Sequence, residues 1–311
     1  MEQEPGGRLG TPQALRTVIS LSRAERALAA GLVLILVAGA ALYVALRPLP
    51  VPPSVPVVAP VPVPVEKVVG TSVEGRAITA YQYGTGDTAL LFVGGMHGGY
   101  EWNSVLLAYQ FMDYLKANPA AVPANVSVVV IPVANPDGLY KVVGTEGRFA
   151  AASVSTDTAV SKSGRFNARA VDLNRNFDCN WQEKSTWQNR PVSAGTAPFS
   201  EPESRAIRKA VLDYRPAAVV FWHSQANAVY ASACHAGPLS GTLAAMHAYA
   251  KAAGYPAVES FDAYPITGDS EGWLASINIP AITVELKTHE TTEWEKNLAG
   301  IKALLVLYGK P

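Results

Sequence analysis

The sequence predicts an α/β domain with a mixed, largely parallel sheet flanked by helices, preceded by a single transmembrane helix. Three observations lead to this prediction. An uncharged segment lies near the N-terminus, a proline-rich segment follows it, and strand-like and helix-like runs alternate over the rest of the chain. With 311 residues the chain is long enough for one large domain or two small ones.

Residues 27–46 carry no charge, and this run is long enough to cross a bilayer as a helix. Arginines are concentrated before it: Arg8, Arg16, Arg23 and Arg26 precede the run, and only Arg47 follows closely. The positive-inside rule therefore predicts a cytoplasmic segment, residues 1–26, and an extracytoplasmic domain after the anchor. A cleaved signal peptide is the alternative, although its apolar core would normally be shorter.

The next segment, residues 47–65, contains eight prolines and no charge after Arg47. Proline at this density favours extended polyproline II and excludes helix or central strand. We therefore expect a semi-rigid linker, followed by a folded domain at residues 66–311. A docking site for a proline-recognition module is the alternative use of such a segment.

The net charge and the cysteine content limit the classes of function that the chain could have. The net charge is zero and the pI is about 7.0, so nothing favours nucleic acid as a partner. Both cysteines, Cys179 and Cys234, lie in the predicted domain. Outside the cytoplasm they could form one disulfide, but two buried thiols are equally compatible with the sequence.

Strand and helix candidates alternate along the domain. The strand candidates are residues 89–95, 125–134, 217–224 and 281–287, and the helix candidates are 104–118, 201–214, 240–254 and 292–309. Near-continuous apolar runs suit strands buried on both faces, and the alternation predicts a largely parallel sheet. The second helix has a start signal, with Ser200 as N-cap, Pro202 in the first turn and Glu203 three residues after the cap.

Polar residues stand where these strands end, which is where open α/β sheets bind ligands. His97 follows the first strand candidate, His223 ends the third and Glu285 closes the fourth. Glu101 comes shortly after His97, and two imidazoles with one carboxylate form a catalytic zinc set with an open position. A hydrogen-bonded His–Glu pair without metal is the alternative. The other histidines are interpreted as structural: His235, His247 and His289.

Basic and amide side chains gather in one stretch, "GRFNARAVDLNRNFDCNW", residues 164–181. It contains Arg165, Arg169, Asn174 and Arg175 alongside Asp172. A guanidinium group matches a carboxylate with two parallel hydrogen bonds, and an asparagine adds a neutral donor. The stretch therefore suits a substrate carboxylate, and a surface loop held by salt bridges is an equal alternative.

Several motifs occur in a fixed order: "GGMHGGYEW", "NPDG", "VDLNRNFD", "PFSEPES", "WHS", "YPITGDSEGW" and "TVELK". Together they resemble the zinc carboxypeptidase family related to carboxypeptidase A, in a short bacterial form, over most of residues 70–310. The resemblance implies one Zn²⁺ per chain, held by His97, Glu101 and His223. It also implies that Asp172 orients a ligand histidine, a role that fixes the tautomer.

The same resemblance assigns the catalytic residues. Glu285 matches the general base, and Arg165 is expected to polarise the scissile carbonyl. Arg169 is the competitor for that role, because the spacing before "DLNRNF" varies across the family. Asn174 and Arg175 match the pair that binds the terminal carboxylate of the substrate.

Two further positions bear on substrate choice. Tyr264 matches the mobile tyrosine that closes over the substrate. Glu271 falls where the residue at the pocket floor sets side-chain preference, and a carboxylate there would favour a cationic side chain. Asp269 is the alternative selector, with Glu271 then pointing to solvent.

The first motif departs from the family pattern. The family spaces its first two ligands as His-x-x-Glu, whereas three residues separate His97 from Glu101. Gly98 and Gly99 can adopt φ values that other residues avoid, so we expect the added residue to bulge and Glu101 to remain a ligand.

The expected activity is that of a membrane-anchored zinc peptidase. It would hydrolyse an amide bond next to a substrate carboxylate, releasing a C-terminal amino acid from peptides or peptidoglycan stem peptides (muropeptides). Two alternatives stay open at this point: an amidohydrolase acting on small N-acyl amino acids, and a non-catalytic tethered binding module on a peptidase scaffold. A serine hydrolase built on Ser224 lacks the usual Gly-x-Ser-x-Gly turn.

Overall fold

The computed structural model describes residues 21–47 and 63–310. Most of the predicted cytoplasmic segment, including Arg8 and Arg16, and most of the proline-rich linker lie outside these residues. The chain divides into two compact units, Met1–Ala59 and Pro60–Pro311. Each unit is described by itself.

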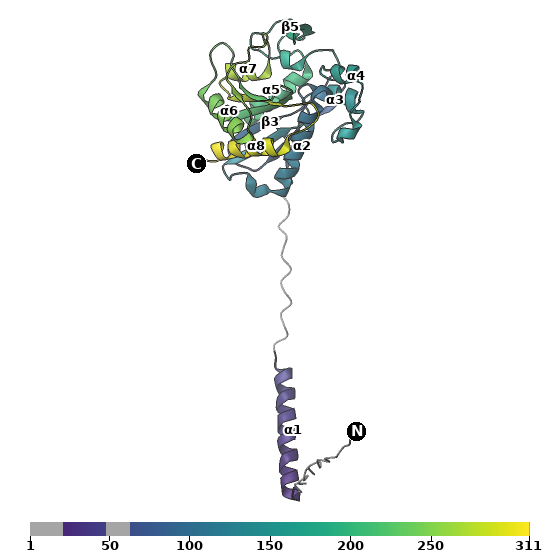
Figure 1. The fold of residues 1–311 in the computed structure, drawn as a ribbon, viewed down its shortest axis with the longest axis vertical. Helices are drawn as coiled ribbons and strands as arrows, with labels where there is room; N and C mark the ends of the chain where they lie inside the picture. Colours follow the sequence, from purple (N-terminus) through teal and green to yellow (C-terminus); the bar gives the residue numbers. More distant parts are fainter. Residues whose placement is uncertain (1–20, 48–62, 311) are drawn as a thin grey trace, which may run out of the picture. The chain divides into compact units, whose positions relative to one another are not determined.

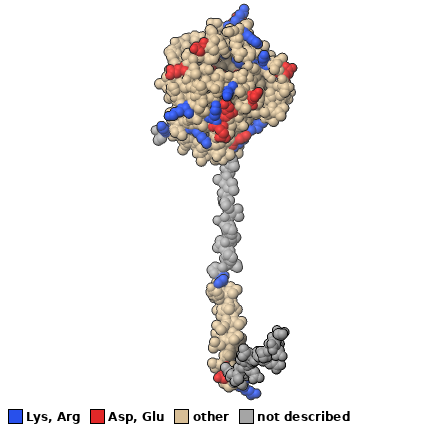
Figure 2. Space-filling model, viewed as in Figure 1, with Lys and Arg blue, Asp and Glu red and all other residues tan. Residues whose placement is uncertain are grey.

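Within residues 21–47, the described part of the first unit, the chain forms one helix, α1 (Arg23–Ala45). Its N-terminus is closed by a capping box, in which Ser22 and Glu25 each bind the backbone N–H of the other. Over most of its length the helix surface carries no charge (Figure 2). In the described part of the chain, α1 is the one helix long and apolar enough to cross a membrane, and a signal sequence would have the same properties.

The second unit is built on an eight-stranded mixed sheet, with strand order β1-β2-β4-β3-β7-β10-β8-β9. The strands are β1 (Val65–Thr71), β2 (Ala77–Tyr83), β3 (Thr88–Val93), β4 (Val126–Ile131), β7 (Ala218–Ser224), β8 (Ala228–Ala231), β9 (Ala257–Val258) and β10 (Ala281–Leu286). The four central strands, β4, β3, β7 and β10, are parallel. They match the four predicted runs and confirm the predicted fold class.

Helices cover both faces of this sheet (Figure 1). The longer helices are α2 (Trp102–Ala117), α5 (Pro202–Tyr214), α6 (Ser240–Ala253) and α8 (Trp294–Tyr308). On one face α2, α6 and α8 pack on side chains such as Phe92 and Trp222, and on the other face α5 packs on Leu91 and Phe221. Consecutive residues of one strand therefore belong to different cores, which explains the continuous apolar runs.

Short elements complete the unit. They are α3 (Pro136–Val143), α4 (Thr158–Ser163), α7 (Ser270–Ser276) and a two-stranded hairpin of β5 (Lys184–Trp187) and β6 (Arg190–Ser193). The predicted cap of α5 was wrong: the helix begins one residue later, with Glu201 as N-cap. The Ser200 hydroxyl donates to the Glu201 side chain instead, and Glu203 accepts from the backbone N–H of Val73.

The two cysteines, whose state the sequence left open, form a disulfide between Cys179 and Cys234. The bond joins the segment after Asp172 to the loop after β8, across a sequence separation of 55 residues. Both cysteines line one cavity of the domain, so the bond fixes two walls of that cavity.

Candidate active site

The site lies at the carboxyl ends of the central strands. β3 pairs with β4 on one side and with β7 on the other. The chain continues from β3 to one side of the sheet and from β7 to the opposite side, and where connections diverge in this way a crevice opens beyond the strand ends. His97 lies just beyond the end of β3, and His223 is the penultimate residue of β7. Glu101 ends a short 3₁₀ helix, Gly98–Glu101, that leads into α2.

The added residue of the first motif is absorbed by that 3₁₀ helix. Gly98 has a φ of +47°, and a Cβ there would lie 2.5 Å from the carbonyl oxygen of Gly164. Gly99 has an ordinary φ, but a Cβ would come within 2.4 Å of the Val142 side chain. The first glycine is therefore needed for its conformation and the second for close packing, and the turn brings Glu101 back toward His97.

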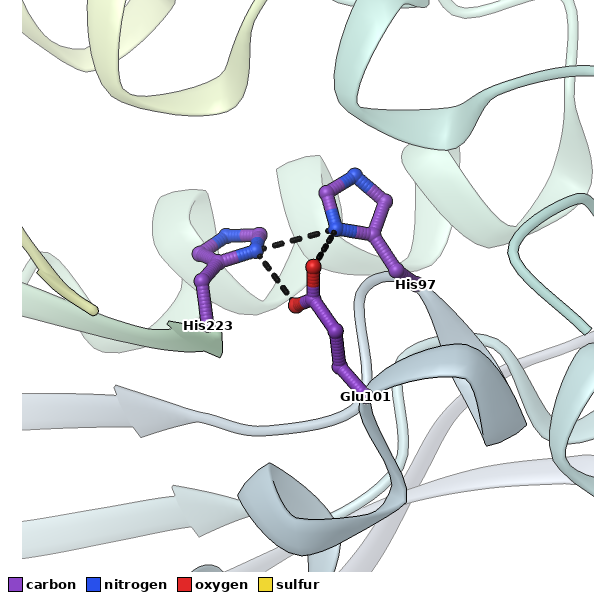
Figure 3. Close-up of side chains that lie close together, drawn as sticks. All are labelled: His97, Glu101 and His223. Carbon is purple, nitrogen blue, oxygen red and sulfur yellow. Dashed lines mark hydrogen bonds and ion pairs between the residues drawn. The ribbon is translucent and has the colours of Figure 1, made fainter. Parts of the chain in front are cut away.

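Three side chains converge at this point (Figure 3). The Nδ1 atom of His97 lies 2.8 Å from Oε1 of Glu101, and the Nδ1 atom of His223 lies 2.9 Å from Oε2 of the same carboxylate. The two Nδ1 atoms are 3.1 Å apart. All three residues are buried, and their ligand atoms lie within 4.8 Å of one another.

The chemistry of this donor set fits a divalent cation. A carboxylate only accepts hydrogen bonds, and two imidazole nitrogens 3.1 Å apart leave room for one proton between them. A metal ion resolves the conflict by taking all three lone pairs. Burial alone would lower the pKa of His223, yet Glu101 and Glu271 raise it well above its usual value, so the site attracts positive charge. Imidazole and carboxylate ligands in this number suit zinc.

Asp172 lies behind His97. Its Oδ1 atom is 3.5 Å from Nε2 of His97, on the side of the ring away from Glu101. Arg165 donates to Asp172 through Nε at 2.9 Å, and its Nη2 atom lies 2.8 Å away. Burial opposes ionisation of Asp172, but the Arg165 guanidinium holds the pKa of that carboxyl well below its usual range.

Arg165 itself reaches the metal-binding cluster. Its Nη1 atom is 3.9 Å from Oε1 of Glu101, and its guanidinium lies over the Trp187 ring at 4.4 Å. Arg169 does not approach this point: its side chain is 56% exposed and faces Glu201 at 3.5 Å. Of the two arginines considered from the sequence, Arg165 therefore lies beside the metal-binding residues.

Glu285 is brought to the cluster by the sheet. It lies opposite His223 in the parallel pairing of β10 with β7, and its Oε2 accepts from the backbone N–H of Ala226 at 3.2 Å. Removal from bulk water, together with the charge of Glu101, raises the pKa of Glu285 to about 7. A carboxylate with this pKa is suited to accept and return a proton near neutral pH.

A cavity of about 400 Å³ opens over these groups. Its lining includes the predicted substrate-binding residues Asn174, Arg175, Tyr264 and Glu271, together with Arg165 and Glu285. The Oδ1 atom of Asn174 accepts from the backbone N–H of Ser270, so its amide hydrogens are directed elsewhere, and they meet no protein acceptor in the described part of the chain. Arg175 is buried and is held by the backbone carbonyls of Asn174 and Thr186.

Glu271 and Asp269 both line this cavity, at the start of α7. Glu271 is buried and does not point to solvent, whereas Asp269 is half-buried and caps α7 by accepting from Gly272 at 2.7 Å. Burial and the charge of Glu271 raise the pKa of Asp269 to about 6. Two carboxylates so close together favour a cationic group between or beside them.

His289, interpreted from the sequence as structural, lies at the cavity. It lines the cavity, its ring lies 4.6 Å from the Tyr100 ring, and its Nδ1 atom is 2.6 Å from the Ser224 hydroxyl. Its position three residues past the end of β10 offered a signal, because β10 carries Glu285 to the same edge of the sheet.

Comparisons with known proteins agree with this geometry. The family model described as zinc carboxypeptidase matches residues 61–298. Among curated proteins, carboxypeptidase B of Astacus astacus is 32% identical over 155 residues, which are 47% of this chain and 48% of that protein. Murein peptide amidase A of Escherichia coli K12 is 33% identical over 152 residues, 45% of this chain and 59% of that protein. The aligned regions thus span about half the length of these relatives.

Solved structures share the fold. The murein-tripeptide amidase of Escherichia coli O157 superposes with a TM-score of 0.54 at 23% identity, over 78% of this chain and 92% of that one. Bovine thrombin-activatable fibrinolysis inhibitor, in complex with a tick carboxypeptidase inhibitor, gives 0.60 at 18% identity, over 79% and 88% of the two chains. With the family model matching most of the chain over the residues that build the metal cluster, the protein belongs to the zinc carboxypeptidase family.

Proposed function

We propose that this protein is a membrane-anchored zinc peptidase that hydrolyses the amide bond next to a substrate carboxylate. The observation that carries the proposal is the convergence of His97, Glu101 and His223 beside Glu285, at one end of a cavity that also holds Arg175. A metal cluster, a proton acceptor and a carboxylate-binding group are the parts such a hydrolysis requires.

A bound zinc ion supplies Lewis-acid chemistry, because it lowers the pKa of water and polarises a carbonyl oxygen. The protein's own groups do the rest. Glu285 takes a proton from the attacking water and passes it to the leaving amine. Arg165 provides fixed positive charge where the carbonyl oxygen becomes negative, a contribution of about 2.7–4 kcal/mol per donor in other enzymes.

The substrate is held by its terminal carboxylate. The free amide hydrogens of Asn174 and the guanidinium of Arg175 offer donors on one wall of the cavity, and Tyr264 stands half-buried on a loop at its edge. Because the cavity volume suits a small group rather than a protein domain, we favour the release of one C-terminal residue.

A peptidoglycan stem peptide is the substrate we favour over a general peptide. One relative is a murein peptide amidase, and the negative charge at the start of α7, which lines the cavity, would attract a side-chain amine. The other relative is a carboxypeptidase B, so basic C-terminal residues of ordinary peptides are the second candidate class.

We place the catalytic domain outside the cytoplasm. The apolar helix α1 supports a membrane anchor, and the Cys179–Cys234 disulfide supports an oxidising compartment. Protease added to intact spheroplasts should then remove the domain of the full-length chain. Protection of the domain until the membrane is lysed would overturn this placement.

The activity is tested with the full-length chain in detergent, with and without zinc. N-acylated dipeptides, stem peptides and small N-acyl amino acids are compared for release of the carboxylate-bearing product. Zinc-dependent hydrolysis of the peptides is expected. Stoichiometric zinc without turnover of any substrate would favour a binding module, and turnover of N-acyl amino acids alone would favour the amidohydrolase.

A further inference from the structure

The carboxylate of Glu271 is placed against a metal-binding residue. Its Oε1 atom lies 3.6 Å from Nε2 of His223, on the side of the ring away from Glu101. Both of its oxygens have partners: Thr283 donates to Oε1 at 2.8 Å and Ser270 donates to Oε2 at 2.8 Å. The side chain is therefore fixed in position and 4% exposed, rather than free to meet a substrate.

The arrangement repeats what is seen at the other histidine. His97 turns Nδ1 toward Glu101 and Nε2 toward Asp172 at 3.5 Å, and His223 turns the same two atoms toward Glu101 and Glu271. A carboxylate that faces the far nitrogen of a ligand imidazole favours a proton there, which leaves the other nitrogen free to bind the metal. Each of the two imidazoles thus has a carboxylate of its own.

Asp269 has the opposite character. Only one of its oxygens accepts a protein hydrogen bond in the described part of the chain, from the backbone N–H of Gly272. No lysine or arginine of the described residues forms an ion pair with it, although the Arg175 guanidinium acts on it at longer range, and it lines the cavity. Asp269 is therefore a half-buried carboxylate whose second oxygen can accept a hydrogen bond from a substrate.

From these contacts we infer that Glu271 is a positioning residue for His223 and that Asp269 is the carboxylate that meets the cationic side chain of the substrate. The second half of this inference rests on the proposed function. The role of Glu271 concerns metal binding alone, so it can be tested whether or not the protein turns over a substrate.

The test of Glu271 is the affinity of the full-length chain for zinc, measured in detergent by competition with a chromophoric chelator. Glu271→Gln keeps the size and removes the charge, and we expect zinc to bind about 10–100-fold more weakly. Asp172→Asn should weaken zinc to a similar degree. Glu290→Gln removes an exposed carboxylate next to the cavity-lining His289 in the sequence and should leave zinc affinity unchanged.

Two further measurements separate positioning from folding. Thr283→Val keeps the carboxylate and removes the hydroxyl that holds it, so zinc affinity should fall by a smaller factor than in Glu271→Gln. With cobalt in place of zinc, both variants should change the visible absorption bands, because the geometry at His223 changes. Wild-type zinc affinity and an unchanged cobalt spectrum in both variants would overturn the role of Glu271.

The test of Asp269 is substrate preference. Asp269→Asn should keep wild-type zinc affinity and lower the ratio of kcat/KM for lysine-ended over alanine-ended N-acyl dipeptides about tenfold or more. If Glu271→Gln lowers this ratio and Asp269→Asn does not, Glu271 is the selector and the inference is wrong. If the wild-type chain binds zinc but cleaves neither dipeptide, the proposed function fails on these substrates while the zinc measurements still decide the role of Glu271.

Discussion

Glu285 and His223 lie opposite one another on adjacent parallel strands, β10 and β7. The proposed base and one proposed metal ligand are therefore held together by backbone hydrogen bonds of the sheet rather than by a mobile loop. A group placed this way keeps its distance from the metal-binding cluster through the reaction, which is the preorganisation that proton transfer requires.

Replacing Glu285 by Gln should abolish most of the turnover while zinc remains bound. Glu285 is not among the three residues that converge on the metal position, and Gln keeps the shape without accepting a proton. We expect kcat to fall by about 10²–10⁴-fold. The check is kcat on a cleaved dipeptide together with zinc content, and near-wild-type turnover with full zinc would remove Glu285 from the role of base.

The pH dependence of kcat/KM should show an acid limb set by Glu285. The base must be ionised, so activity falls as the pH drops through its pKa. Burial raises that pKa from 4.5 to about 7, and a bound cation would bring it down again. The midpoint of the acid limb should therefore lie above pH 4.5 and no higher than about pH 7. A profile that stays flat down to pH 4.5 would contradict the assignment.

The strands that carry the site were predictable because burial on both faces gives a continuous apolar run. The edge strands were not: β1 has one buried residue, Val69, and β9 has only two residues, so neither leaves a pattern. Helix α3 was not predicted, because "NPDG" is typical of a turn. In the structure Asn135 caps a helix that has Pro136 at its first position.

The candidate metal ligands followed from the family motifs, but their surroundings did not. The sequence favoured Arg165 and left Arg169 as the competitor, and the fold separates the two by burying the first and exposing the second. The contact of Glu271 with His223 joins residues far apart in the chain, and no local pattern encodes it.

Gly98→Ala should damage the metal site rather than the chemistry. The residue has a positive φ, and an added Cβ would meet backbone at 2.5 Å, so the 3₁₀ helix must shift and carry Glu101 with it. We expect weaker zinc binding and a loss of stability of about 1–3 kcal/mol. Gly144→Ala is the control, because it has a similar φ but open space around it. Equal zinc affinity in the two variants would contradict this account of the added residue.

Removing the disulfide should destabilise the domain. The loop closed by Cys179 and Cys234 spans 55 residues, and the chain-entropy model gives about 4 kcal/mol for such a loop. The double Ser variant should therefore unfold at lower denaturant concentration than the oxidised wild type. Identical midpoints for wild type with and without reductant, with mass analysis showing that reduction had occurred, would contradict this expectation.

Ser224→Ala should cost stability but not abolish turnover. Asn103 donates to the carbonyls of Thr288 and Thr291, so its Oδ1 can only accept, and the Ser224 hydroxyl must donate to it. The hydroxyl hydrogen is then used, and His289 must donate to the hydroxyl oxygen.

Alanine at position 224 would leave both partners unpaired, and we expect a loss of about 1–3 kcal/mol in the free energy of unfolding. Ser163→Ala, at an exposed helix end, is the control and should change stability little. Denaturant unfolding and a dipeptide assay at low temperature measure the two effects. Complete loss of turnover in folded, zinc-loaded Ser224→Ala would mean that the hydroxyl takes part in the reaction, because the hydrogen-bond network alone gives it no other task.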